Sequence, residues 1–109
     1  FVNKKADLTS TSATTLYTVP DATTAIVKSI LISEDSGNAD TITVTITDTS
    51  DAVFSLFKTK AISANATTEL LTAPLVLQQN EVLKVTAATA NRLHVILSAL
   101  QSKPREVIT

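Results

Sequence analysis

The stretch DTITVTITD, residues 40–48, alternates almost perfectly between apolar and threonine side chains. Successive side chains of a β-strand point to opposite faces, so this pattern predicts a strand with two different faces. One face carries Ile42, Val44 and Ile46, which require a hydrophobic core. The other face carries only threonines, namely Thr41, Thr43, Thr45 and Thr47. The open question is whether this threonine face meets water or another protein.

The same two-residue period recurs along the chain, and no segment has a convincing helical period. Such strands, separated by turn residues, are typical of a β-sandwich or jelly roll. Gly37 is the only glycine, so tight hairpin turns are scarce and arches between sheets are favoured. We therefore predict a single-domain, all-β antiparallel β-sandwich, jelly-roll or Ig-like, with seven or eight strands and flexible termini. The predicted strands cover residues 15–19, 23–33, 41–47, 52–60 and 68–72, two strands within 75–87 joined by a turn at 78–80, and 92–100.

Residues 23–33 form the longest predicted strand and carry apolar side chains on both faces. A strand that is apolar on both faces fits a central position in a sheet. Its inward side chains are one of two alternating sets, either Ile26, Ile30 and Ile32, or Ala25, Val27 and Leu31.

The predicted domain covers residues 14–100, with an N-terminal arm at 1–13 and an extended C-terminal tail at 101–109. In the tail, Pro104 favours an extended chain, and the β-branched residues that follow fit a strand. Such a segment can add to the sheet edge of a neighbouring subunit, and the alternative is a frayed terminus. The predicted contact residues of the tail are Glu106, Val107 and Ile108.

Composition argues against most kinds of chemistry. Cysteine is absent, which excludes a thiol nucleophile, and His94 is the only histidine, whereas a zinc site needs three or four ligands. A Ser-His-Asp triad would have to use His94, and no serine is flanked by elbow glycines. The net charge of −1 gives no field for gathering nucleic acid, and no apolar run reaches the roughly 20 residues of a membrane span. The start at residues 1–10 lacks the apolar region of a secretory signal. We expect no enzyme activity, no cofactor, no metal, and neither nucleic acid nor membrane as a partner.

Two groups of polar residues have alternative interpretations. For His94 we favour a strand residue at a sheet edge or at a subunit contact. Acidic residues gather in two predicted turns and could hold calcium, but turns commonly carry aspartate and the spacing is not that of an EF-hand. These acidic residues are Glu34, Asp35 and Asp40 in the first turn and Asp48 and Asp51 in the second.

The threonine face is the clearest candidate for a partner contact. Proteins that must remain monomeric interrupt neutral strand edges with lysine. Lys28, Lys58 and Lys84 interrupt their own predicted strands, whereas residues 40–48 contain no lysine. We therefore predict that the threonine strand lies near a subunit contact or is covered by a second sheet.

Three stretches of the chain resemble small virion structural proteins of tailed bacteriophages, especially those of marine phages and cyanophages. The stretches are TTLYTVPDATTAIVKSILI (14–32), AISANATTELL (61–71) and PLVLQQNEVLKV (74–85), and the resemblance extends over about residues 14–100. This chain has QQNE where relatives often have a Gly-Asp turn. The resemblance implies a β-sandwich that decorates or cements a capsid or belongs to the neck or tail, and it implies no catalytic residues.

We therefore predict a non-enzymatic structural protein of a phage virion. Within this class we favour a capsid decoration or cement protein that stabilises the shell. Its partners would be capsid or other virion proteins and copies of itself, with a trimer favoured, assembled in the host cytoplasm. One alternative is a neck, tail or head-fibre component. Another is a carbohydrate-binding adsorption module, for which only Tyr17, Phe54 and Phe57 could supply sugar platforms.

Overall fold

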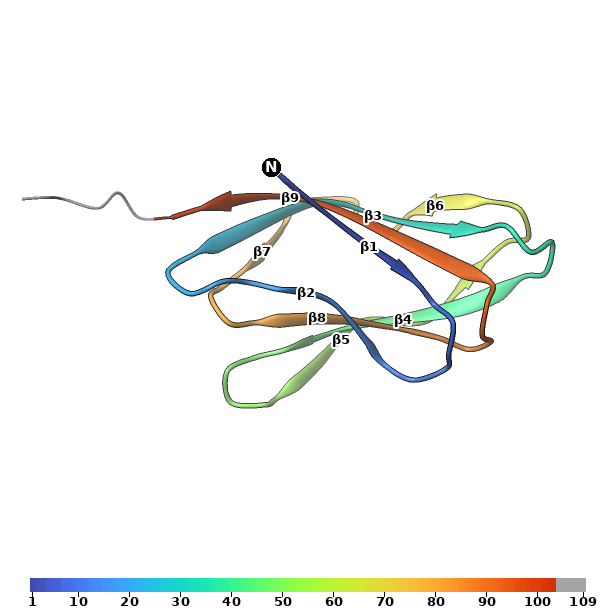
Figure 1. Cartoon of the computed structure of the whole chain (residues 1–109), viewed down its shortest axis with the longest axis horizontal. Coiled ribbons are helices and arrows are strands. Elements are labelled where there is room, and N and C mark those ends of the chain that lie inside the picture. The colour runs from blue at the N-terminus through green and yellow to red at the C-terminus, as the bar shows by residue number, and fades with distance from the viewer. Residues whose placement is uncertain (104–109) are drawn as a thin grey trace, which may run out of the picture.

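The predicted all-β sandwich is confirmed by the computed structural model, which describes residues 1–103 (Figure 1). Two antiparallel sheets pack face to face, and the described residues contain nine strands, where the sequence predicted seven or eight. The strands are β1 (Val2–Asp7), β2 (Thr14–Thr18), β3 (Thr24–Glu34), β4 (Asp40–Thr47), β5 (Val53–Ile62), β6 (Thr67–Glu69), β7 (Leu75–Leu77), β8 (Val82–Ala87) and β9 (Leu93–Ser102).

The chain passes repeatedly from one sheet to the other. The first sheet has the order β1-β9-β3, and the second edge of β3 is shared by β6 and β7. The second sheet has the order β2-β8-β4-β5. Among the described strands, only β4 and β5 are consecutive in the chain and also hydrogen-bonded to each other. The expectation of arches between sheets, drawn from the scarcity of glycine, is confirmed.

The core lies between the two sheets and is almost entirely aliphatic. Ile42 and Val44, from the alternating stretch at residues 40–48, are completely buried in it. Tyr17 is the one aromatic side chain that is buried, and its hydroxyl accepts a hydrogen bond from the side-chain amide of Gln101. The predicted inward face of residues 40–48 is therefore confirmed, because Ile46 is partly buried and also packs against the core.

Because of a β-bulge in β3, each of the two predicted inward sets is correct at two of its three residues. Ala25 and Val27 are buried, but after the bulge at Lys28 the buried residues are Ile30 and Ile32. One extra residue in a strand reverses which side chains face the core, because the side-chain period is two. An alternation that is read straight through residues 23–33 cannot detect this change.

The predicted N-terminal arm is wrong, because β1 pairs along β9 from Val2 to Asp7 and belongs to the first sheet. The sequence did not reveal this strand, because the charged Lys4 breaks the apolar alternation. Lys4 occupies a position on the inner face, opposite the buried Leu97. The Lys4 ammonium lies 5.9 Å from the centre of the Tyr17 ring, a cation–π distance. The predicted domain end at residue 100 is also slightly short, since β9 runs to Ser102.

Candidate functional site

The threonine face of β4 lies on the outer surface of the second sheet. Its four side chains are partly exposed, so the suggestion that a second sheet covers them is wrong for the described residues. The Thr43 hydroxyl accepts a hydrogen bond of 3.1 Å from the backbone N–H of Thr59 on β5. A contact between this face and a partner stays a prediction for Thr41, Thr43, Thr45 and Thr47.

Residues 40–48 do not form an unprotected sheet edge, so this part of the prediction is wrong. β4 lies between β8 and β5 and is hydrogen-bonded to both, so neither of its edges is free. In addition, Lys84 on β8 lies directly opposite Thr45 and puts a positive charge on the threonine face. The edge strands of the second sheet are β2 and, next to β4, β5.

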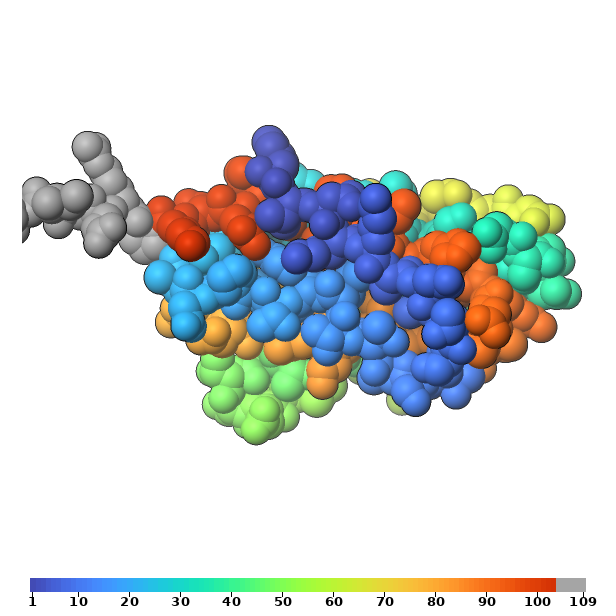
Figure 2. All heavy atoms as spheres, viewed as in Figure 1, coloured from blue at the N-terminus to red at the C-terminus, as the bar shows by residue number. Residues whose placement is uncertain are grey.

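β5 is an apolar strand that the rest of the molecule leaves uncovered. Val53 is 62% exposed, Phe54 55% and Leu56 37%, and no charged residue interrupts VFSLF at residues 53–57. Phe57 alone in this stretch packs against the core. Figure 2 shows the chain around β5, in green, projecting from the body of the molecule. Exposed large apolar side chains gathered on one strand are typical of a contact surface.

The exposure of Phe54 follows from the register of the β4–β5 hairpin. Phe54 pairs directly with Ile46, so the two side chains lie on the same face of the sheet as the buried Val44. Ile46 is nevertheless only partly buried, whereas Val44 is completely buried. The hairpin therefore extends past the part of the sandwich where the opposite sheet covers its inner face.

A hydrogen-bonded turn precedes β5, and two bulges interrupt the strand. A carboxylate oxygen of Asp48 accepts the backbone N–H of Ser50 at 2.9 Å and that of Ala52 at 3.0 Å, which closes the turn before the strand. Extra residues in β5 produce two bulges, one at Leu56 and one at residues 58–59, where Thr59 has a φ of 49°. Bulges bend an edge strand and limit long ladders with a neighbour. β5 is thus an ordered surface with a short accessible stretch.

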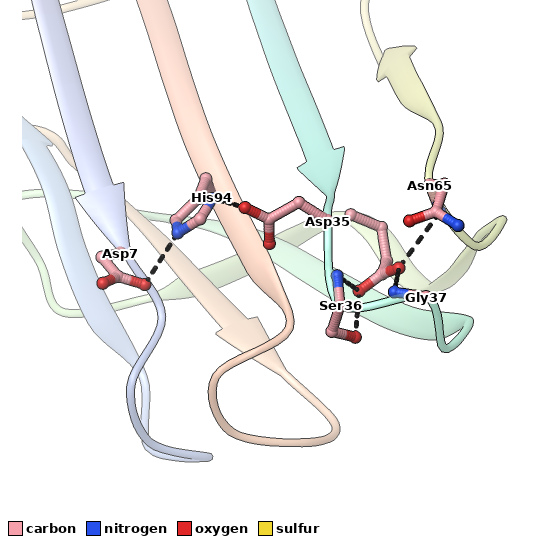
Figure 3. A network of polar contacts seen from close by, with 7 residues as sticks. Asp7, Asp35, Ser36, Gly37, Asn65 and His94 are labelled. Carbon is pink, nitrogen blue, oxygen red and sulfur yellow. Dashed lines mark hydrogen bonds and ion pairs between the residues drawn. The ribbon is translucent and has the colours of Figure 1, made fainter.

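The acidic turn after β3 is built around the buried carboxylate of Glu34. Glu34 is only 2% exposed, and its carboxylate accepts backbone N–H groups from Ser36 at 2.9 Å, Gly37 at 3.0 Å and Asn65 at 3.1 Å (Figure 3). The Ser36 hydroxyl also donates to it, and this bond is the largest cause that lowers the pKa of Glu34 from 4.5 to about 2. The three backbone N–H groups lower the pKa further, and burial opposes them. Glu34 therefore joins two loops as a structural anion.

The stability of the fold should depend on the ionisation of Glu34. Its pKa in the folded state, about 2, lies below the ordinary value of 4.5, so the ionised carboxylate stabilises the native chain. This contribution is present in full above pH 4.5 and is lost as the pH falls toward 2. We expect the thermal midpoint of the wild type to fall more steeply over this interval than that of Glu34→Gln. Equal slopes in differential scanning calorimetry would contradict the role given to Glu34.

His94 lies on the outer face of the first sheet between two carboxylates (Figure 3). Its Nε2 is 3.2 Å from a carboxylate oxygen of Asp7, and its Nδ1 is 3.5 Å from one of Asp35. β9 is a central strand, so the interpretation of His94 as a sheet-edge residue is wrong. The side chains of Asp7 and Asp35 are both more than half exposed, and ion pairs of this kind contribute ~0–1 kcal/mol.

Other possible sites offer little chemistry in the described part of the chain. Residues 1–103 contain no group of three or more histidine or acidic side chains placed to hold a metal ion. A shallow depression beside the start of β4 is lined mainly by small side chains, and its one charged group, Asp40, accepts the Thr89 N–H at 3.1 Å. Within the same residues, no helix is long and apolar enough to cross a membrane. The predicted tail contacts at Glu106, Val107 and Ile108 lie outside the described residues.

The fold and this surface define an antiparallel β-sandwich with an uncovered apolar edge strand. No family model, curated protein or solved structure matches the chain. Any proposal about its function therefore starts from the geometry of β5.

Proposed function

We propose that the chain is a non-enzymatic structural protein of a phage virion, in the first place a capsid decoration or cement protein. The observation that carries the proposal is the exposed apolar edge strand β5, with Val53, Phe54 and Leu56 open to solvent. An apolar edge of this kind is a liability in a protein that works alone, because it invites association with other strands. In a particle, a neighbouring subunit covers it.

The size of β5 fits a role in an assembly of many copies. Three exposed apolar side chains on one strand make a small contact, and small interfaces are weak when isolated. On a shell the same contact repeats in a fixed geometry, so avidity compensates for the modest affinity of each one. The resemblance to phage virion proteins supports the same role, and it leaves a neck, tail or head-fibre position as the alternative.

Few of the aromatic rings that the carbohydrate-binding alternative requires are exposed. A sugar platform requires exposed aromatic rings, and Tyr17 is only 2% exposed. Phe57 is partly buried and packs against the core, which leaves Phe54 alone among the three candidates. One exposed ring on a strand does not make a binding platform for a glycan.

Phage particles purified from lysates of cells that produce this chain provide the test of the proposal. We expect mass spectrometry to find the chain as a multi-copy component, and cryo-electron microscopy to locate it on the shell with β5 in contact with a neighbour. Density on the neck or tail would favour the alternative within the same class. Absence of the chain from purified particles would overturn the proposal.

The number of copies of each variant that remain on the particles shows whether β5 or the threonine face makes the contact. We expect Phe54→Ser to reduce the number of copies severalfold, because it removes the central exposed ring while the core is untouched. Thr45→Lys is the matched change on the threonine face, and we expect it to be retained, because Lys84 already lies beside that position. Loss of Thr45→Lys together with retention of Phe54→Ser would assign the contact to the threonine face.

A further inference from the structure

The two ends of the exposed stretch of β5 carry opposite charges. Asp51 precedes the apolar residues 53–57, and Lys58 and Lys60 follow them. All three charged residues are exposed, and within residues 1–103 none of them takes part in an ion pair. Asp48, in contrast, uses a carboxylate oxygen to close its own turn. The strand thus offers an acidic end, an apolar centre and a basic end.

We propose that β5 packs against β5 of a second copy of this chain, antiparallel, around a two-fold axis near Ser55. Antiparallel alignment brings the acidic end of each strand to the basic end of the other. With the axis between Ser55 and Leu56, Asp51 faces Lys60 and Phe54 faces Phe57. With the axis one residue earlier, Asp51 faces Lys58 and Val53 faces Leu56. Both registers pair unlike charges at the ends and apolar side chains in the centre.

The charge pattern favours this arrangement over the other ways in which two strands can meet. A parallel pair in register would put Lys58 against Lys58 and Lys60 against Lys60, and like charges directly opposite each other are destabilising. An antiparallel pair is self-complementary, because one surface supplies both halves of the contact, as an isologous dimer requires. The bulges at Leu56 and residues 58–59 keep the paired stretch short. Side-chain contacts, rather than a long ladder, therefore hold the two copies together.

This inference rests on the contact role that the proposed function gives to β5, but it names the partner. It also differs from the trimer favoured by the sequence, because a two-fold contact closes at two copies. The contact is small, so we expect dimers that form at high protein concentration and weaken as salt screens the charged ends.

Reversing the charges at one end of the strand tests the orientation. Asp51→Lys makes both ends of β5 basic, and Lys58→Asp combined with Lys60→Asp makes both ends acidic. By sedimentation equilibrium, we expect each of these variants to associate on the order of tenfold more weakly than the wild type. An equimolar mixture of the two should recover the dimer, because every end then meets its opposite. The triple variant that carries all three changes should also form a dimer by itself.

Controls separate a lost contact from a lost fold. Asp51 has a φ of 61°, which asparagine tolerates well, so Asp51→Asn removes the charge with little backbone strain and should weaken the dimer less than Asp51→Lys. Each variant should keep the circular dichroism spectrum and thermal midpoint of the wild type. Phe54→Ser should abolish association in every charge background.

The outcomes distinguish this inference from the proposed function. A mixture of charge variants that stays monomeric, a wild type of three-chain mass, or a wild type that is monomeric at every soluble concentration would overturn the two-fold contact. If the wild type is monomeric at every soluble concentration but the chain is found on purified particles, the virion role remains intact. In that case a different protein contacts β5. A dimer with the predicted charge dependence and no chain on particles would overturn the virion role alone.

Discussion

Replacing Leu8 with alanine is expected to lower the free energy of unfolding by about 3 kcal/mol. Leu8 follows β1 directly and is 1% exposed in the core. Its N–H donates to the Leu93 carbonyl at 3.0 Å, and its own carbonyl accepts the N–H of Asn91 at 2.8 Å. The backbone is therefore tied to the start of β9, so the cavity left by the missing side chain cannot close easily. Urea denaturation followed by circular dichroism measures the loss.

Thr9→Ala is the matched control for this prediction. Thr9 is the next residue in the chain and is exposed, so its substitution should change stability by less than about 0.5 kcal/mol. If residues 1–13 formed an arm outside the domain, the two variants would behave alike. Similar, small effects of Leu8→Ala and Thr9→Ala would contradict the place of this segment in the sandwich.

Glu34→Ala should lower the thermal midpoint on the order of 10 °C. The substitution removes the acceptor for the N–H groups of Ser36, Gly37 and Asn65 in two different loops. Gly37 and Asn65 both have positive φ values, 84° and 55°, so each loop also loses a bond that holds its unusual backbone. These part-buried N–H groups lose a charged acceptor, and hydrogen bonds to charged groups contribute more to stability than neutral ones.

Asp35→Ala is the control for this second prediction. Asp35 is the neighbouring acid, but its side chain is 62% exposed, and its contact is the exposed ion pair with His94. We expect its thermal midpoint to stay within about 2–3 °C of the wild type. Calorimetry of the two variants at pH 7 makes the comparison. An equal fall in both would show that the turn depends on its total charge rather than on the hydrogen bonds of Glu34.

The candidate site was predicted only in part, and the reason lies in strand order. The sequence predicted a contact at residues 40–48 because they alternate regularly and contain no lysine, yet β4 is paired on both sides. The exposed strand is the next one, whose residues 53–57 have the composition of a core strand. The pattern of Phe54 and Leu56 on alternate positions does not reveal whether the opposite sheet reaches them. Their exposure, at 55% and 37%, marks the surface.

The buried anion was likewise visible only as a residue of a turn. Glu34 was grouped with Asp35 and Asp40 as acids between two strands, with calcium as an alternative role. Its carboxylate instead accepts N–H groups from its own turn and from Asn65, which is distant in sequence. A sequence pattern identifies local turn formers, but it does not identify the second loop that folds against them.

By itself, the sequence determined the all-β class, most strand positions and the preference for arches over hairpins, because these depend on a local two-residue period and on the scarcity of glycine. The tertiary structure alone decided that Val2–Asp7 is a strand, that a bulge at Lys28 changes the inward set, and that β5 forms an open edge. Each of these depends on pairing between segments far apart in the chain. Periodicity within one segment carries no information about which neighbour that segment will find.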